Sequence, residues 1–167
     1  MIPFLNASAP LVKKLFKDNQ ADLKELATKL NISSVSTHFL VEIVIPLTAF
    51  FASLDKRESP YFICFTGGQG SGKTTLSEFV QLVLQKGFDK RTTGFSIDDI
   101  YKTKEEREKL ADSVHPLCKV RGVPGTHDIN YLLQTIKRFD KSKYPIKLPL
   151  FNKLSDSHKK TQKLQNE

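Results

Sequence analysis

The feature that most constrains this chain is a glycine-rich stretch near its middle. Residues 67–74 read Gly-Gly-Gln-Gly-Ser-Gly-Lys-Thr and fit the pattern G-x-x-x-x-G-K-[ST]. Residues 61–66, just before them, are rich in aromatic and β-branched side chains, which predicts a buried strand. Residues 75–86 follow with apolar side chains at helical spacing and predict a helix that ends at Gly87. Strand, glycine loop and helix in this order predict a phosphate-binding loop.

The chemistry of this loop follows from its residue types. Glycines let the backbone turn tightly and direct several N–H groups at phosphate oxygens, and the following helix adds its positive N-terminal end. We expect Lys73 to reach the β- and γ-phosphates of ATP and Thr74 to bind Mg²⁺. The alternative, a glycine-rich turn with a chance Lys-Thr, does not account for the flanking strand and helix. The residues expected to bind the nucleotide are Gly67, Gly68, Gln69, Gly70, Ser71, Gly72, Lys73, Thr74 and Thr75.

A pair of carboxylates follows a second predicted strand, residues 92–97. In open α/β sheets, ligands bind outside the carboxyl ends of the strands, where Asp98 and Asp99 would lie. One carboxylate could accept the proton of a substrate hydroxyl that attacks the γ-phosphate, and the other could hold Mg²⁺ through water. We therefore predict both as catalytic candidates and Asp99 as a metal ligand beside Thr74. The alternative is that Asp99 caps a helix, and the sequence does not decide which carboxylate is the base.

Residues 115–128 are dense in Gly, Pro, His and Arg, which predicts an irregular segment. Arg121 and His127 suit a small anionic substrate or a phosphate in transfer. Asp128 either joins them at the acceptor or caps the helix predicted over 129–139. The alternative for Arg121 and His127 is a rigid surface loop.

The N-terminal third predicts helices without evident chemistry. Residues 10–30 carry apolar side chains at helical spacing and predict one amphipathic helix, or two broken near Asp18. Residues 37–54 predict a buried helix kinked at Pro46, and their longest uncharged run is too short to span a membrane. Residues 103–113 predict a charged helix. The expected divisions are a helical segment 1–58, a core 59–153 and a basic polar tail 154–167 that we expect to be disordered.

Charge and cysteine content limit the remaining possibilities. The net charge is +8, and much of it lies from Lys137 onward, so a basic nucleic-acid-binding module stays an alternative, although no nucleic-acid motif accompanies the charge. We expect Cys64 to be buried in the first strand. The spacing of Cys64 and Cys118 is not that of metal ligands, so we expect both to be reduced thiols. The N-terminus lacks the basic and apolar regions of a signal peptide, so the expected compartment is the cytoplasm.

Four stretches together carry a family resemblance: residues 67–77, residues 96–101 (Ser-Ile-Asp-Asp-Ile-Tyr), His115-Pro-Leu, and residues 121–128 (Arg-Gly-Val-Pro-Gly-Thr-His-Asp). They look like the D-glycerate 3-kinase family, P-loop kinases related to uridine kinase and phosphoribulokinase. The resemblance implies an α/β P-loop NTPase fold, Rossmann-like and three-layered, with a parallel sheet. It also implies phosphoryl transfer from MgATP to a hydroxyl of a small acid such as D-glycerate. Asp98 would then be the general base, and Arg121, His127 and Asp128 would shape the acceptor site.

The chain departs from this family near its end. Over residues 148–153 the family has a Leu-Pro-Arg-Phe-Asp-Lys type run, and here Leu150 and Asn152 replace its Arg and Asp. Family members continue into a further strand with an acidic end and a lid, which we do not find in this sequence. We therefore expect an incomplete sheet with an exposed edge, which a second chain would complete. The alternative is a truncated nucleotide-binding protein without catalytic activity.

Overall fold

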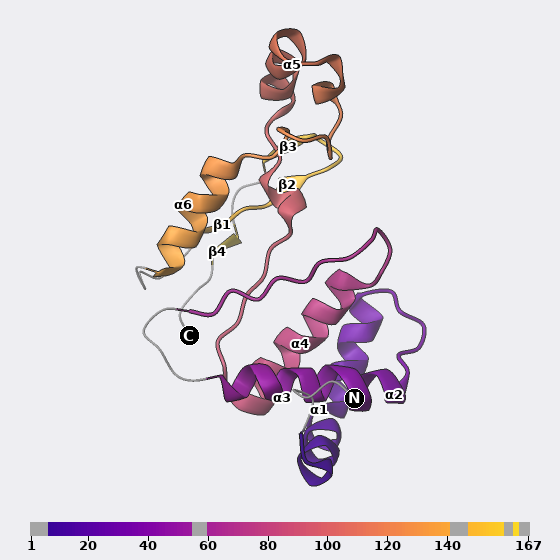
Figure 1. Cartoon of the computed structure of the whole chain (residues 1–167). Coiled ribbons are helices and arrows are strands. Elements are labelled where there is room, and N and C mark those ends of the chain that lie inside the picture. The colour runs from indigo at the N-terminus through magenta and orange to yellow at the C-terminus, as the bar shows by residue number, and fades with distance from the viewer. Residues whose placement is uncertain (1–6, 55–59, 141–146, 159–161, 164–167) are drawn as a thin grey trace. The chain divides into compact units, whose positions relative to one another are not determined.

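The computed structural model describes residues 7–54, 60–140, 147–158 and 162–163. The chain forms two compact units (Figure 1). The N-terminal unit comprises Met1–Lys56 and Phe62–Gly94, and the C-terminal unit comprises Arg57–Tyr61 and Phe95–Glu167. This division differs from the predicted boundaries, because the helix after the glycine loop packs against the N-terminal helices and shares their core.

Helices make up the regular structure described in the N-terminal unit. They are α1 (Ala9–Lys29), α2 (Thr37–Phe39), the π-helical turn η1 (Leu40–Val44), α3 (Ile45–Ser53) and α4 (Lys73–Phe88). Of the two predicted alternatives for the first segment, the structure has the single helix. Pro10 lies in its first turn, where a missing N–H costs nothing. Asn19 is buried in its middle, and its side-chain amide donates to the Leu15 carbonyl at 2.8 Å, so the polar group is satisfied within the helix.

The predicted irregularity at Pro46 takes the form of the π-helical turn η1, which ends two residues before the proline. Proline has no N–H to donate, and its ring clashes with the carbonyl four residues earlier in a regular α-helix. A wider turn at this point relieves both problems. Thr48 is fully buried one turn later and donates its hydroxyl to the Val44 carbonyl at 2.7 Å. Helix α3 therefore continues to Ser53.

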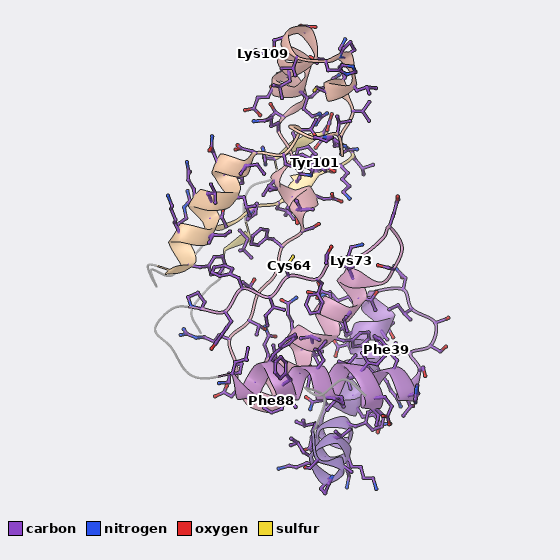
Figure 2. All side chains as sticks on the ribbon, in the orientation of Figure 1. Phe39, Cys64, Lys73, Phe88, Tyr101 and Lys109 are labelled. Atoms are coloured by element: carbon purple, nitrogen blue, oxygen red, sulfur yellow. The ribbon has the colours of Figure 1, made fainter. Side chains whose placement is uncertain are left out.

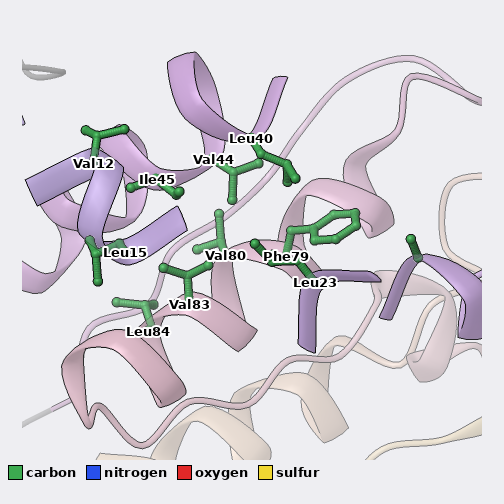
Figure 3. Packing of buried hydrophobic residues seen from close by; sticks show 11 residues of the cluster. Val12, Leu15, Leu23, Leu40, Val44, Ile45, Phe79, Val80, Val83 and Leu84 are labelled. Carbon is green, nitrogen blue, oxygen red and sulfur yellow. The ribbon is translucent and has the colours of Figure 1, made fainter. Parts of the chain in front are cut away.

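The core of the N-terminal unit lies where α4 packs against α1 and α3 (Figure 3). Phe79 is completely buried and meets the ring of Phe39 edge to face, with ring centroids 6.5 Å apart. Burial of such a side chain contributes about 1.5–3 kcal/mol. The buried apolar residues of this cluster are Val12, Leu15, Leu23, Ala27, Leu40, Val44, Ile45, Phe79, Val80, Val83 and Leu84.

Helix α4 ends one residue later than predicted, at Phe88, because Asp89 adopts the left-handed conformation (φ 49°) that terminates it. Gly87 lies inside the last turn. A Cβ atom at Gly87 would lie 2.7 Å from Cδ2 of Leu15 on α1, so any side chain at position 87 would require the Leu15 side chain to shift. This glycine therefore permits the close approach of α1 and α4.

The two strands predicted at residues 61–66 and 92–97 do not pair as strands in the described part of the chain. The side chain of Phe62 is 52% exposed, and Cys64 is exposed where we predicted burial. A strand needs neighbours to satisfy its backbone N–H and C=O groups, so a β-forming sequence cannot make a strand by itself. Thr92 instead lies along α4, where its carbonyl accepts the Gln85 side-chain amide at 2.9 Å. The parallel sheet stays a prediction.

The C-terminal unit combines short helices with two pairs of antiparallel strands. Its elements are the 3-10 turn η2 (Ile97–Ile100), α5 (Lys104–Ser113), the 3-10 turn η3 (Pro116–Lys119), α6 (Ile129–Asp140), β1 (Lys147–Leu148), β2 (Phe151–Asn152), β3 (Ser157–His158) and β4 (Gln162–Lys163). Strand β2 pairs with β3, with Phe151 opposite His158, and β1 pairs with β4. The charged helix predicted over 103–113 is confirmed as α5, which begins after a capping box between Thr103 and Glu106.

The predicted disordered tail differs from the structure over Leu154–His158, which form a turn and strand β3. Together β2, the turn and β3 make a hairpin, residues 151–158, that we call the β2–β3 hairpin. Residues 159–161 and 164–167 of the predicted tail, and residues 55–59, lie outside the described residues. Among the helices that the structure describes, none is both long and apolar enough to cross a bilayer.

Candidate functional site

The glycine loop, residues 67–72, leads directly into α4 in the N-terminal unit. Gly70 and Gly72 have φ values of 74° and 80°, in the left-handed region that residues with a side chain rarely adopt. The Ser71 N–H donates to the Gly68 carbonyl at 3.3 Å and closes a tight turn. The sequence therefore supplies glycine where this turn requires it.

The N-terminus of α4 is arranged differently from those of η2 and α5. Gly72 is its N-cap, no side chain caps it, and no acidic residue lies in its first turn. The first N–H groups of a helix have no partner within the helix, and its N-terminal end carries partial positive charge. In η2 and α5, a capping box satisfies such groups. The end of α4 is therefore open to an external anion.

The Lys73 side chain folds back over the loop at the start of α4 (Figure 2). Its ammonium donates to the carbonyls of Gly67 at 2.9 Å and Gly68 at 2.6 Å. Thr74 is exposed in the first turn of α4, and its role as a metal ligand stays a prediction. The other members of the predicted nucleotide set are exposed or half-buried around it: Gly67, Gly68, Gln69, Gly70, Ser71, Gly72 and Thr75.

A second group of predicted residues lies in the C-terminal unit, around η2. Ser96 is the N-cap of this turn: its hydroxyl accepts the Asp98 N–H at 3.1 Å, and its own N–H donates to Oδ2 of Asp99 at 2.8 Å. The other carboxylate oxygen of Asp99, Oδ1, accepts the N–H of Phe151 in β2 at 3.2 Å. Both carboxylate oxygens of Asp99 therefore accept backbone N–H groups. The role of Asp99 as a metal ligand stays a prediction.

Asp98 is placed differently from its neighbour. Its Oδ2 atom accepts the Lys153 ammonium at 2.6 Å. This hydrogen bond lowers the pKa of Asp98 below its ordinary value; burial opposes the effect, and the positive charge of Lys153 and the Tyr101 hydroxyl add to it. The Asp98 carboxylate is thus held ionised, and its side chain is 37% exposed. Of the two candidate bases, Asp98 is the one whose carboxylate does not bind backbone N–H groups among the described contacts.

His127 lies next to η2 through a short antiparallel bridge to Tyr101. The two rings stack, with centroids 4.4 Å apart, and the Asp128 N–H donates to the Ile100 carbonyl at 2.7 Å. The Nε2 atom of His127 is buried without a hydrogen-bond partner among the described groups. Burial, followed by the charge of Asp98, raises the pKa of Tyr101 above its ordinary value, so this hydroxyl stays protonated. The bridge thus brings His127 to the same region as Asp98.

Arg121 reaches the β2–β3 hairpin from the irregular segment before His127. Its Nη1 atom donates to the Lys153 carbonyl at 3.1 Å and lies 3.6 Å from Oδ1 of Asp156. The guanidinium lies over the Phe151 ring, 5.8 Å from its centroid. Arg121 therefore belongs to the same cluster as Asp98.

Asp128 is the N-terminal cap of α6, as one of the two predicted alternatives had it. Its Oδ1 atom accepts the Tyr131 N–H at 2.9 Å. A role at the acceptor stays a prediction. The structure thus gathers Asp98, Arg121 and His127 in one unit and places Lys73 and its loop in the other.

The sequence did not identify four residues of the C-terminal cluster: Tyr101, Arg107, Lys153 and Asp156. Their partners lie 26 to 55 positions away in the chain, so no local spacing signals the contacts. Two signals were available: Tyr101 ends one of the stretches that carry the family resemblance, and Phe151 and Lys153 match the family's Leu-Pro-Arg-Phe-Asp-Lys run.

Comparison with known proteins points to one class, proteins named as kinases. The first is "Uncharacterized kinase mug58" of Schizosaccharomyces pombe, 33% identical over 115 residues, which cover 66% of this chain and 41% of the relative. The second is "Probable ATP-dependent kinase TDA10" of Saccharomyces cerevisiae, 36% identical over 106 residues, which cover 58% of this chain and 37% of the relative. These similarities support a relationship to ATP-dependent kinases, and neither name specifies glycerate.

The chain spans about two fifths of the length of these relatives. No family model and no solved structure matches it. The activity of the whole protein therefore belongs to the proposal that follows.

Proposed function

We propose that this chain is an ATP-dependent small-molecule kinase that transfers a phosphoryl group from MgATP to a hydroxyl of a small acid such as D-glycerate. The observation that carries the proposal is the uncapped N-terminus of α4, which joins a glycine turn to the Lys73 ammonium. Backbone N–H groups, a positive helix end and an ammonium are the groups that bind nucleotide phosphates. The similarity to proteins named as kinases gives independent support.

In this proposal the N-terminal unit binds the nucleotide. Lys73 leaves the carbonyls of Gly67 and Gly68 and turns its ammonium to the phosphates, while the loop N–H groups bind the phosphate oxygens. The Thr74 hydroxyl would hold Mg²⁺, which would neutralise the charge that develops during transfer.

The C-terminal unit supplies the acceptor side. Asp98 accepts the proton of the substrate hydroxyl as that oxygen attacks the γ-phosphate, and it suits this role because it is ionised and partly exposed. Arg121 and His127 would contact the anionic groups of the acceptor, and Asp128 would hold their segment on α6. Catalysis of this kind depends mainly on positioning and charge stabilisation.

The fold that accompanies this function is a P-loop NTPase with a parallel sheet. Residues 61–66 would become a strand when neighbouring strands, supplied by a second chain, pair with it. The exposed apolar side chains of Phe62 and Ile63 support this, because they match a strand that is covered when the sheet is complete. Protection of the amides of residues 61–66 from hydrogen exchange, rising with protein concentration, would support completion by a second copy.

The test combines ATP binding with ATP turnover. Binding is measured by calorimetry with Mg²⁺, and turnover by ADP release with D-glycerate, for the wild type, Lys73→Ala and Asp98→Asn. Lys86→Ala on the same helix is the matched control, because this exposed lysine pairs only loosely with Asp22, at 3.9 Å. We expect Lys73→Ala to weaken ATP binding by about 10- to 100-fold, through loss of charge-assisted hydrogen bonds. Asp98→Asn should lose turnover and keep binding.

Three outcomes separate the alternatives. Turnover that both variants lose establishes a kinase. ATP binding that depends on Lys73, without turnover in the wild type, would leave a nucleotide-binding protein without catalytic activity. Absence of ATP binding in the wild type would overturn the proposal.

A further inference from the structure

The contact between Asp98 and Lys153 joins residues 55 positions apart, and the function proposed above uses it only to keep Asp98 ionised. Oδ2 of Asp98 and Nζ of Lys153 are 2.6 Å apart, and the two side chains are 37% and 60% exposed. Ion pairs this exposed contribute little by themselves, because forming them requires two mobile side chains to be fixed. The ion pair therefore has a single geometry only if other contacts already fix the backbone at Asp98 and at Lys153.

The Asp98 side of the pair is held by η2. The Asp98 N–H donates to the Ser96 hydroxyl at 3.1 Å, and Oδ2 of Asp99 accepts the Ser96 N–H at 2.8 Å. These two bonds form a capping box that fixes the first turn of η2. The backbone conformation of Asp98 is thus fixed by bonds that do not involve its side chain.

The Lys153 side is held at three points along the β2–β3 hairpin. The Phe151 N–H donates to Oδ1 of Asp99 at 3.2 Å, and the Lys153 carbonyl accepts Nη1 of Arg121 at 3.1 Å. Asp156, three residues further on, forms a bidentate pair with the buried Arg107. Lys153 therefore extends from a turn that is fixed both before and after it.

We propose that Lys153 is a positioning residue for Asp98: its ammonium binds Oδ2 and holds the carboxylate in one rotamer, oriented toward the acceptor hydroxyl. This inference rests on the proposed function for the catalytic purpose of the Asp98 orientation. The contact by which Lys153 holds the Asp98 side chain is a property of the folded chain and does not depend on catalysis. Small losses of orientation at a general base reduce the rate of a transfer step strongly, since the reacting atoms must be aligned.

The test measures the side chain of Asp98 directly. Three-bond scalar couplings give its χ1 rotamer populations by NMR in the wild type, Lys153→Met and Lys153→Arg. Lys109→Met is the charge-matched control: Lys109 is an exposed lysine of α5 in the same unit (Figure 2). Leu154→Ser is the control for the turn itself, because Leu154 is 98% exposed next to Lys153.

We expect one dominant χ1 rotamer of Asp98 in the wild type and in both controls. In Lys153→Met the Asp98 side chain should average over several rotamers, and in Lys153→Arg the single dominant rotamer should return. An Asp98 side chain that keeps its single rotamer in Lys153→Met would overturn the inference, whether or not the protein turns over ATP. All five proteins should show the same Phe151 amide shift, which reports that the hairpin stays docked. If the Phe151 shift moves in Lys153→Met, Lys153 holds the hairpin rather than the carboxylate, and the inference fails.

Where the wild type turns over ATP, kinetics add a second readout. Lys153→Met should lower kcat about 10- to 100-fold while KM for ATP stays the same, and Lys153→Arg should restore part of kcat. A wild type without turnover would count against the proposed function alone, because the rotamer measurement still decides the role of Lys153.

Discussion

Arg107 and Asp156 lie 49 positions apart in the sequence, and their side chains form a bidentate ion pair inside the C-terminal unit. The Arg107 side chain is only 3% exposed. Its Nη1 atom also donates to the Lys102 carbonyl at 3.0 Å, and its Nε to the Lys119 carbonyl at 3.3 Å. One guanidinium thus joins the segment before α5, the end of η3 and the β2–β3 hairpin.

Replacing this arginine should destabilise the C-terminal unit. Arg107→Met removes four hydrogen bonds at a buried position and leaves the Asp156 carboxylate without its main partner, so we expect the free energy of unfolding to fall by about 2–4 kcal/mol. Urea unfolding followed through the Phe151 amide signal measures this. Arg138→Met, at an exposed position on α6, is the control. The double variant Arg107→Met/Asp156→Leu should recover part of the loss, and a single-variant loss below about 0.5 kcal/mol would contradict the prediction.

The same ion pair makes the C-terminal unit sensitive to acid. The hydrogen bond from Arg107 holds the pKa of Asp156 below its ordinary value of 3.8, against an opposing effect of burial. A carboxyl whose pKa is lower in the folded state adds stability that is full above the unfolded pKa and is lost as pH falls through the folded pKa. We therefore expect the melting temperature of this unit to drop as pH falls below about 4. Asp156→Asn should drop less over the same range, and parallel curves for the two proteins would argue against the pair.

Asp98 and Asp99 should differ in what they contribute to stability. Asp99→Asn replaces a carboxylate whose two oxygens accept the N–H groups of Ser96 and Phe151, so we expect a loss of about 1 kcal/mol. Asp98→Asn removes one partly exposed ion pair and should change stability by less than about 0.5 kcal/mol. Chemical denaturation of both variants compares the two values. Equal losses would mean that the two carboxylates share the structural role.

The packing of α4 is tested at Phe79. This side chain is fully buried, and Phe79→Ala should lower the free energy of unfolding of the N-terminal unit by about 3–5 kcal/mol through lost contacts and the cavity that remains. Ile43→Ala is the control, because Ile43 in η1 is 42% exposed and should cost much less. Thermal unfolding by circular dichroism at helical wavelengths gives both values. A Phe79→Ala loss no larger than that of Ile43→Ala would place the core elsewhere.

Sequence reasoning succeeded where a feature depends on a few neighbouring residues. The first helix, predicted from residue 10 and found as Ala9–Lys29, and the cap of Asp128 at α6 are local, because hydrogen bonds or backbone geometry within four residues decide them. The strand at residues 61–66 stays a prediction, because a strand is decided by its partners, and no strand pairs with these residues in the described part of the chain.

The sequence by itself determined the glycine turn before α4, since only glycine adopts the φ values of positions 70 and 72 at little cost. It also determined that an ammonium follows this turn at Lys73. The tertiary structure alone decided which carboxylate binds Lys153, which arginine is buried, and that Tyr101 stacks on His127. These contacts join residues 26 to 55 positions apart, and long-range packing rather than local propensity brings such residues together.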